Sequence, residues 1–375
     1  MYVTLTGARN NAGDFLIRHS AHTLLARVRP DRPVHDLNSW EPIDDVKLET
    51  INAAKALILC GGPAIRRRMV APQELTPYDL SPTTLSKIRV PIVTMGLGWN
   101  HKDARWSAVA AAIPTPDTRH LLSRIRADGL NNSVRDIEAA GFLGGEGVDR
   151  VTVTGCPALF VNEALDGQRA ATKNAGRVVV SAGVLGRLAG TEFEQQFRDV
   201  VELACQSFGS ENVLVAFHHA TTAAGYAAAY GLGAAVADRA VLRWVADRGL
   251  AWCDLSGSSQ GMIDLYANCL LHIGFRVHSH LLCTSLRRPS ILLAEDSRGF
   301  GAGRLLGGWV IPAIEPLDAA AAPAEAPQEA SKGLKHMLKE AVSSFLANDL
   351  SLFRAPWDRV SLLRNRMMTF LMALP

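Results

Sequence analysis

The chain has 375 residues, which is longer than one hydrophobic core usually supports, so its length favours two domains with a ligand-binding seam between them. Hydrophobic residues make up 48% and charged residues 20%, a balance that excludes a chain disordered throughout. The formal net charge of +3 comes from 39 basic and 36 acidic residues spread along the chain, so no extended positive field for nucleic acid is expected.

In the first half of the chain, short β-rich runs alternate with helical patterns, which predicts a parallel sheet covered by helices. Residues 15–28 form a helical pattern whose apolar face carries Ile17, Ala21, Leu24 and Leu25. We expect this face to pack on the sheet. The predicted strands are Tyr2–Thr6, Ala56–Cys60, Pro91–Met95, Asn131–Val134 and Val151–Thr154.

Glycine or polar residues follow several of these strands. They are the segments GARNNAG at 7–13, GGP at 61–63, GLG at 96–98 and Arg135-Asp136. In open parallel sheets the ligand crevice lies beyond the carboxyl ends of the strands. We therefore expect these loops to converge on one site.

A second α/β unit follows a polar segment, residues 162–177, which is the best candidate for an interdomain linker. A helical stretch is predicted over Glu192–Cys205. The predicted strands are Val178–Ser181, Val213–Phe217, Ala251–Asp254, Leu271–Gly274 and Ile291–Glu295. The pattern places one domain at residues 1–165 and a second at residues 176–316.

The last part of the chain, residues 317–375, consists of an Ala/Pro-rich segment followed by a segment with helical patterns. Residues 317–330 are rich in Ala and Pro and are expected to form a linker or exposed loop. Helices are predicted over Lys332–Phe345 and Val360–Leu374, the latter mostly apolar but bearing Arg364 and Arg366. A tail helix packed on one domain is favoured over a peripheral membrane anchor, although the second use stays open.

Other sequence features concern location and metal binding. The six cysteines stand singly, with no pair at metal-ligand or redox spacing, and are expected to be buried, reduced thiols. The N-terminus lacks the features of an export signal, and no apolar run approaches the ~18 residues of a membrane-spanning helix, so a soluble cytoplasmic protein is expected. The eleven histidines form no recognisable metal motif, and a Walker-type phosphate loop is missing.

Several motifs occur in the order seen in a known family. Weaker ones are N-x-G-D at 11–14 and the glycine turn at 61–63. More specific are S-x-R-D at 133–136 followed by T-G-C-P at 154–157, and R-x-H at 276–278 followed by Pro289 and the strand at 290–295. Over about residues 5–300, this series resembles the polysaccharide pyruvyl transferase family.

The resemblance implies an α/β fold of two Rossmann-like domains facing across a cleft, like the B-type glycosyltransferases. The first domain is then the acceptor side and the second the donor side. It also implies an enzyme that moves the enolpyruvyl group of phosphoenolpyruvate onto a sugar of a polysaccharide or glycolipid precursor, forming a pyruvate ketal and releasing phosphate. No cofactor is expected besides this donor substrate. For a lipid-linked acceptor, the C-terminal helix is a candidate membrane contact.

Phosphoenolpyruvate carries a phosphate and a carboxylate, and arginine binds either group bidentately. By resemblance, Arg135 and Arg276, one from each domain, hold the donor, and Arg135 also acts in catalysis as an electrostatic stabiliser of the leaving phosphate. Arg298 stands where the family commonly has a lysine and is a third donor-binding candidate. The motif histidine, His278, is the expected general acid/base, because the reaction needs a proton donor whose pKa is near the working pH.

Further residues are candidate substrate contacts with alternative structural uses. Asn11 and Asp14 begin the first helix, where they either cap its backbone or reach the acceptor sugar. His218, with His219 beside it, follows a strand of the second domain, and either of the two rings contacts ligand or loop backbone. His280 lies two residues after the motif histidine and competes with it for the catalytic role.

Two other functions stay open at this point. A glycosyltransferase would bind a nucleotide sugar in the same cleft, with Glu295 or Asp296 on the ribose hydroxyls. A non-catalytic member of a polysaccharide assembly system would keep the fold without turnover.

Overall fold

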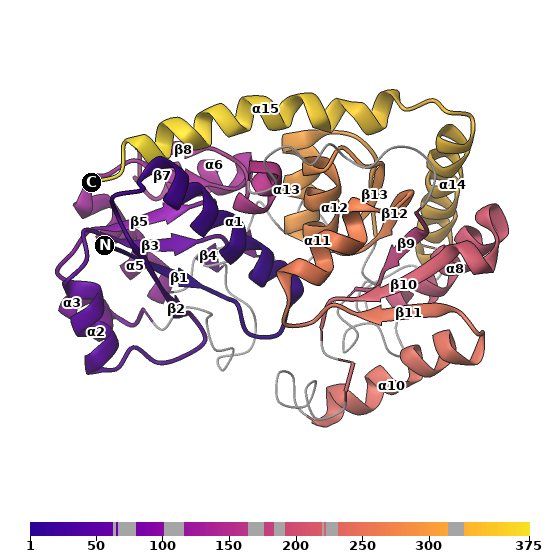
Figure 1. Cartoon of the computed structure of the whole chain (residues 1–375), viewed down its shortest axis with the longest axis horizontal. Helices are drawn as coiled ribbons and strands as arrows, with labels where there is room; N and C mark the ends of the chain where they lie inside the picture. Colours follow the sequence, from indigo (N-terminus) through magenta and orange to yellow (C-terminus); the bar gives the residue numbers. More distant parts are fainter. Residues whose placement is uncertain are drawn as a thin grey trace.

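The computed structural model describes residues 1–62, 65–66, 80–100, 116–163, 176–183, 192–219, 221–222, 232–313 and 326–375. Within these ranges the chain builds two main parallel sheets, of four and six strands, and two smaller parallel sheets of two strands each. Helices cover the two main sheets, and a long C-terminal helix runs along both (Figure 1). The predicted linker at 162–177 and loop at 317–330 lie largely outside the described residues.

The first domain contains short parallel strands and the helices between them. Its elements are β1 (Tyr2–Thr6), α1 (Ala12–Val28), β2 (Val34–Asn38), α2 (Asp45–Asn52), β3 (Leu57–Cys60), β4 (Ile65–Arg66), α3 (Pro82–Lys87), β5 (Ile92–Met95), β6 (Trp99–Asn100), α5 (Pro116–Asp128), β7 (Asn132–Val134), α6 (Ile137–Gly145), β8 (Val151–Val153) and the 3-10 helix η1 (Pro157–Glu163). One parallel sheet has the order β2-β1-β3-β5. The parallel pair β7-β8 lies beside β5, joined to it through a bridge between Leu97 and Val134.

The second domain repeats this architecture with a larger sheet. Its elements are β9 (Val178–Ser181), α8 (Glu192–Phe208), η2 (Ser210–Asn212), β10 (Val213–Phe217), α10 (Leu232–Asp247), β11 (Ala251–Asp254), α11 (Ser259–Ala267), β12 (Leu271–Gly274), α12 (Val277–Ser285), β13 (Ser290–Ala294), α13 (Ser297–Leu306), β14 (Val310–Pro312), α14 (Ala326–Leu346) and α15 (Ser351–Met372). The strand order is β11-β10-β9-β12-β13-β14, all parallel. This order reverses between β9 and β12, where open sheets of this kind bind their ligands.

The predicted strands are confirmed, with ends that differ by at most one residue. They were visible because strands covered on both faces are continuous apolar runs, such as LILC in β3 and VVVS in β9. Strand β2 was missed because its sequence, VHDLN, is largely polar and it lies at the sheet edge. Strand β14 was missed because it is short and ends in Pro312.

The predictions for the end of the chain need two corrections. Residues 326–330, expected in an exposed linker, form the start of α14. The final helix begins at Ser351, and it does not pack on one domain only. Helix α15 contacts α12 and α13 of the second domain as well as α1, β7, β8 and η1 of the first (Figure 1). At its end, the hydroxyl of Tyr2 donates a hydrogen bond to the Pro375 carbonyl at 2.6 Å.

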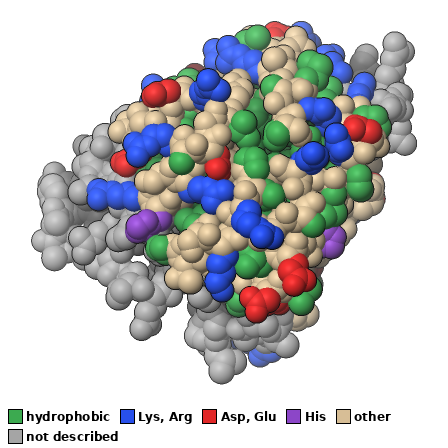
Figure 2. All heavy atoms as spheres, turned by 90° about the vertical axis from the view of Figure 1, so that its left-hand side faces the viewer, with side chains coloured by type: hydrophobic (Ala, Val, Ile, Leu, Met, Phe, Trp, Pro, Cys, Tyr) green, Lys and Arg blue, Asp and Glu red, His purple; other side chains and the backbone are tan. Residues whose placement is uncertain are grey.

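Figure 2 shows the side of the molecule where the first domain and the chain termini lie. Lys and Arg side chains on this side are interspersed with hydrophobic and acidic ones.

Among the described helices, none combines the length and apolarity needed to cross a bilayer. All six cysteines are free thiols, and four of them are buried as expected, whereas Cys205 and Cys253 are partly exposed, which corrects the expectation for these two.

Adjacent leucines on α15 provide a test of its packing. Leu363 is 3% exposed and Leu362 is 54% exposed. We expect Leu363→Ala to lower the free energy of unfolding by about 2 to 5 kcal/mol, because it leaves a cavity between the helix and the first domain. Leu362→Ala should change it by less than about 0.5 kcal/mol. Urea unfolding of both variants measures the difference, and equal midpoints would contradict the packing.

Candidate active site between the domains

The loops that follow the strands of both sheets meet at the seam between the domains. The backbone N–H of Ala12 donates to the His218 carbonyl at 3.0 Å, and the N–H of Gly257 donates to the Asn10 carbonyl at 3.1 Å. Further along the seam, the Ser297 hydroxyl lies 3.4 Å from the Trp99 carbonyl. The carboxyl edges of the two sheets therefore face each other, as the positions of the polar loops indicated.

The R-x-H segment begins α12 directly after β12. Arg276 is the N-terminal cap of this helix, and its backbone N–H donates to the Ser181 hydroxyl at 3.3 Å. Its guanidinium donates across the seam to Asn11 Oδ1 at 2.9 Å. The side chain is 4% exposed, so this contact joins the two domains in a buried setting.

His278 packs against the N-x-G-D turn of the other domain. A Cβ atom at Gly13 would lie 2.0 Å from His278 Nδ1, so only glycine leaves room for the imidazole. The N-x-G-D motif and the more specific R-x-H motif, which are more than 260 residues apart in the chain, are therefore in direct contact. His278 is 5% exposed, and its Nε2 has no hydrogen-bond partner among the residues that the structure describes.

The charge around His278 is strongly positive. Burial is the largest cause that holds the pKa of His278 well below its ordinary value. The guanidinium groups of Arg276, Arg298 and Arg135 lower this pKa further, while Asp296 opposes them. Three arginines from both domains therefore lie near one imidazole, which is neutral at physiological pH in this setting.

Arg135 follows β7 and is 4% exposed. Its Nε donates to Asp136 Oδ2 at 3.1 Å and its Nη2 to the Trp99 carbonyl at 3.3 Å. The guanidinium lies over Gly98, where a Cβ would be 2.3 Å from its Cζ. Arg135 therefore forms a buried ion pair with Asp136 and not a surface one, and Asp136 also caps α6 by accepting from the Ala139 N–H at 2.8 Å.

Of the two uses considered for Asn11 and Asp14, the structure shows helix capping for Asn11. Asn11 caps α1, since its Oδ1 accepts from the Gly13 N–H at 3.2 Å, and its Nδ2 donates to Asp14 Oδ2 at 3.0 Å. Burial raises the pKa of Asp14 to about 6, although the Asn11 hydrogen bond, Arg276 and Arg298 lower it. Asp14 is therefore a carboxyl group near the arginine cluster that titrates close to neutral pH.

Arg298 lies in the first turn of α13 and is held by acidic neighbours. Its Nε donates to both carboxylate oxygens of Asp296 at 3.1 and 2.9 Å, and its Nη2 lies 3.8 Å from Glu295 Oε1. Burial lowers the pKa of Arg298, but Asp296, Glu295 and Asp14 together raise it above its ordinary value. The third donor-binding candidate is thus charged and near the other two.

The adjacent histidines after β10 have different surroundings. His218 Nε2 lies 2.9 Å from the Tyr266 hydroxyl and 3.0 Å from the Ser279 hydroxyl, inside the second domain. Burial and then Arg276, Arg298 and His278 hold the pKa of His219 well below the ordinary value, and burial and then Arg276 also lower the pKa of His218. The sequence left open which of the two rings contacts a ligand, because adjacent residues in a loop do not reveal which way each side chain points.

The structure places His280 apart from this cluster. Its Nδ1 lies 2.8 Å from the hydroxyl of Ser290, which opens β13, at the opposite end from the carboxyl edge. The same hydroxyl lies 2.7 Å from His272 Nδ1, and burial lowers the pKa of His280 to about 4. Residues two apart on a helix point about 200° apart, so His278 and His280 face opposite ways and do not compete for one position.

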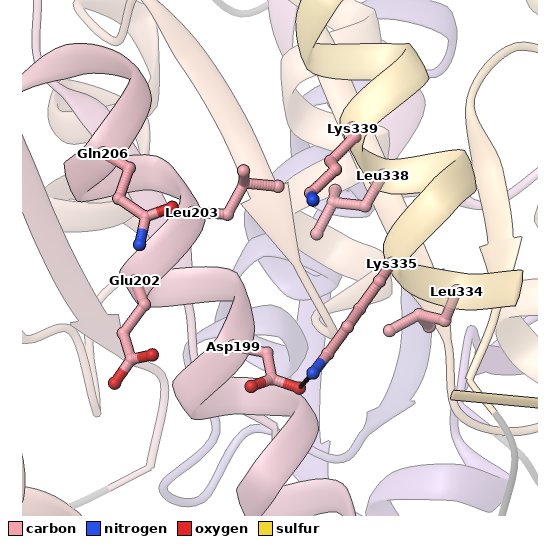
Figure 3. Close-up of a pocket in the computed structure, with 8 residues that line it drawn as sticks. All are labelled: Asp199, Glu202, Leu203, Gln206, Leu334, Lys335, Leu338 and Lys339. Atoms are coloured by element: carbon pink, nitrogen blue, oxygen red, sulfur yellow. Dashed lines mark ion pairs between the residues drawn. The ribbon is translucent and has the colours of Figure 1, made fainter. Parts of the chain in front are cut away.

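The structure also contains a cavity of about 180 Å³ between α8 and α14, away from the arginine cluster (Figure 3). Lys335 and Asp199 form an ion pair of 2.9 Å across it. The lining residues are Asp199, Glu202, Leu203, Gln206, Leu334, Lys335, Leu338 and Lys339.

Within the described ranges, no group of three or more His, Cys, Asp or Glu side chains could hold a metal ion.

Solved structures with a similar fold include S. aureus MnaA and UDP-GlcNAc 2-epimerases. S. aureus MnaA with UDP has a TM-score of 0.52 at 10% identity, covering 95% of this chain and 90% of that one. Methanocaldococcus jannaschii UDP-GlcNAc 2-epimerase with UDP-GlcNAc and UDP has a TM-score of 0.51 at 11% identity, covering 97% and 100%. At these identities the likeness shows the fold alone, which agrees with two Rossmann-like domains.

Comparison with known sequences identifies the family to which the chain belongs. No curated protein matches the chain. The family model described as polysaccharide pyruvyl transferase matches residues 11–297, which include the N-x-G-D, S-x-R-D and R-x-H motifs. Since the match covers more than half of the 375 residues, the chain belongs to the polysaccharide pyruvyl transferase family.

Proposed function

We propose that this transferase moves the enolpyruvyl group of phosphoenolpyruvate onto a sugar of a polysaccharide or glycolipid precursor, forming a pyruvate ketal and releasing phosphate. The observation that supports it most directly is the set of three guanidinium groups, from both domains, around the buried imidazole of His278. Such a concentration of positive charge is suited to a small, multiply charged anion.

The donor's two anionic groups require separate partners. Arg135 reaches the site from the first domain, and Arg276 and Arg298 from the second. The Arg276 side chain makes no capping hydrogen bond to the first turn of α12, and the positive end of the helix dipole there adds to the attraction for an anion. We assign donor binding to these three arginines and stabilisation of the departing phosphate to Arg135 in particular.

The proposed chemistry begins with proton transfer from His278 to the methylene carbon of the donor. Before donor binding the imidazole is neutral, since burial and the arginines lower its pKa. A bound dianion offsets the arginine charge and thereby raises the affinity of His278 for a proton. Protonation of the methylene leaves an oxocarbenium-like carbon, which one sugar hydroxyl attacks, returning a proton to His278. The bond from this carbon to the phosphate oxygen then breaks, and a second hydroxyl attacks the carbon and closes the ketal, while its proton passes to the departing phosphate.

In this proposal the acceptor contacts lie on Asn11 and Asp14. The ionised Asp14 carboxylate accepts a hydrogen bond from a sugar hydroxyl, and Asn11 links Asp14 to Arg276. The reaction uses protein groups alone, with no cofactor besides the donor substrate.

A nucleotide-sugar glycosyltransferase is the second candidate, because the similar epimerase folds were solved with UDP. The carboxylates considered for the ribose have other partners here. Asp296 caps α13 and binds Arg298, and Glu295 lies 3.8 Å from the same guanidinium. These pairings favour the phosphoenolpyruvate assignment.

A thermal-shift series tests the donor, because a ligand that binds the native state raises its melting temperature by mass action. We expect phosphoenolpyruvate to stabilise the protein and UDP- or GDP-sugars to leave it unchanged. Arg135→Ala should remove the shift, whereas Arg304→Ala, an exposed arginine paired with Glu138, should keep it. Stabilisation by a nucleotide sugar alone would overturn the donor assignment. Absence of phosphate release with every sugar tried would favour a non-catalytic protein.

Replacement of the motif histidine tests the acid/base assignment. We expect His278→Ala to lower phosphate release by ~10²- to 10⁴-fold, the range for losing a general acid/base. The phosphoenolpyruvate-induced thermal shift should persist, since the three arginines are intact. Turnover at the wild-type rate in this variant would show that another group moves the proton.

The pH dependence of acceptor use tests Asp14. Because burial raises the pKa of Asp14 to about 6, its carboxyl is ionised at pH 8 and neutral at pH 5. We therefore expect the acceptor KM to rise as the pH falls through about 6. In Asp14→Asn the KM should be high and independent of pH over this range. A wild-type profile in Asp14→Asn would assign the titration to another group.

A further inference from the structure

An exposed tryptophan lies on the acceptor half of the site. Trp40 is 40% exposed and follows β2, at the edge of the first sheet that faces the second domain. Its backbone N–H donates to Asn38 Oδ1 at 3.0 Å, and its indole Nε1 donates to the Gly7 carbonyl at 3.0 Å. The indole is thus fixed at its polar edge while much of the ring faces solvent.

This indole lies close to the Asp14 carboxyl group. A Cβ atom placed on Gly7 would be 3.5 Å from Trp40 Nε1 and also 3.5 Å from Asp14 Cγ. Both groups therefore approach the same point, and Gly7 leaves that point without a side chain. Through Asn11, Asp14 is in turn connected to Arg276 of the second domain.

An aromatic face beside a carboxylate matches the chemistry of a sugar. A pyranose ring has an apolar face of C–H groups, which packs on an aromatic ring, and hydroxyls at its rim, which donate to carboxylate oxygens.

We propose that Trp40 is the stacking platform of the acceptor subsite, on which a pyranose ring packs with a hydroxyl directed toward Asp14. This inference rests on the proposed function, because it names the part of the same site that takes the sugar. It makes Trp40 a determinant of acceptor affinity and leaves donor binding to the arginines.

The chain offers a matched control. Trp252 is 42% exposed, lies on the edge strand β11 of the second sheet and packs against Phe217 with ring centroids 6.1 Å apart. Trp40→Leu keeps apolar volume but removes the aromatic face, and Trp40→Phe keeps an aromatic ring. Melting temperatures of all the variants identify any that lose structure.

Sugar binding is measured without turnover, by saturation-transfer NMR with a panel of p-nitrophenyl hexopyranosides. We expect Trp40→Leu to weaken binding of the preferred glycoside by about tenfold or more, Trp40→Phe to retain most of it, and Trp252→Leu to match the wild type. Unchanged binding in Trp40→Leu overturns the proposal, as does the failure of the wild-type protein to bind any glycoside of the panel.

Phosphate release from phosphoenolpyruvate is scored separately with the same glycosides. In Trp40→Leu we expect a higher acceptor KM with an unchanged phosphoenolpyruvate thermal shift. A wild-type protein that binds glycosides through Trp40 but neither binds nor consumes phosphoenolpyruvate would overturn the donor assignment and support the sugar subsite. Loss of the donor shift in Trp40→Leu would instead contradict a role confined to the acceptor.

Discussion

Burial of positive charge at the seam is the constraint on which the rest of the site depends. An unpaired guanidinium in a low-dielectric setting is costly, so each needs local partners. Arg135 has Asp136, Arg298 has Asp296 and Glu295, and Arg276 donates to an Asn11 amide. This pairing holds the arginines in place, and burial together with their charge depresses the pKa of His278.

Close approach of backbone and side chain brings these groups together. Gly13 leaves room for the His278 imidazole and Gly98 for the Arg135 guanidinium. A Cβ atom at either position would overlap the side chain packed against it. Beneath α12, a buried chain of hydrogen bonds runs from the Arg276 N–H through Ser181 and His272 to Ser290. This chain fixes the start of the helix that carries the R-x-H motif.

The fold by itself does not distinguish this protein from the epimerases that share it, since one scaffold supports many reactions. The assignment of function therefore depends on the residues at the seam of this chain. The first domain contributes Arg135, a carboxyl group and, in our proposal, an aromatic platform for the sugar. The second contributes two arginines and the imidazole. Helix α15 packs on both domains and so connects the two halves of the site.

The sequence alone determined the strands with continuous apolar runs, the succession of two α/β units and the motifs that carry the family. These are local patterns, and neighbouring residues suffice to specify them. It did not determine that His278 and not His280 faces the seam, that His218 lies against the hydroxyls of Tyr266 and Ser279, or that α15 crosses both domains. Only the tertiary structure decided these points, because each depends on contacts with segments far away in the chain, such as that between Gly13 and His278.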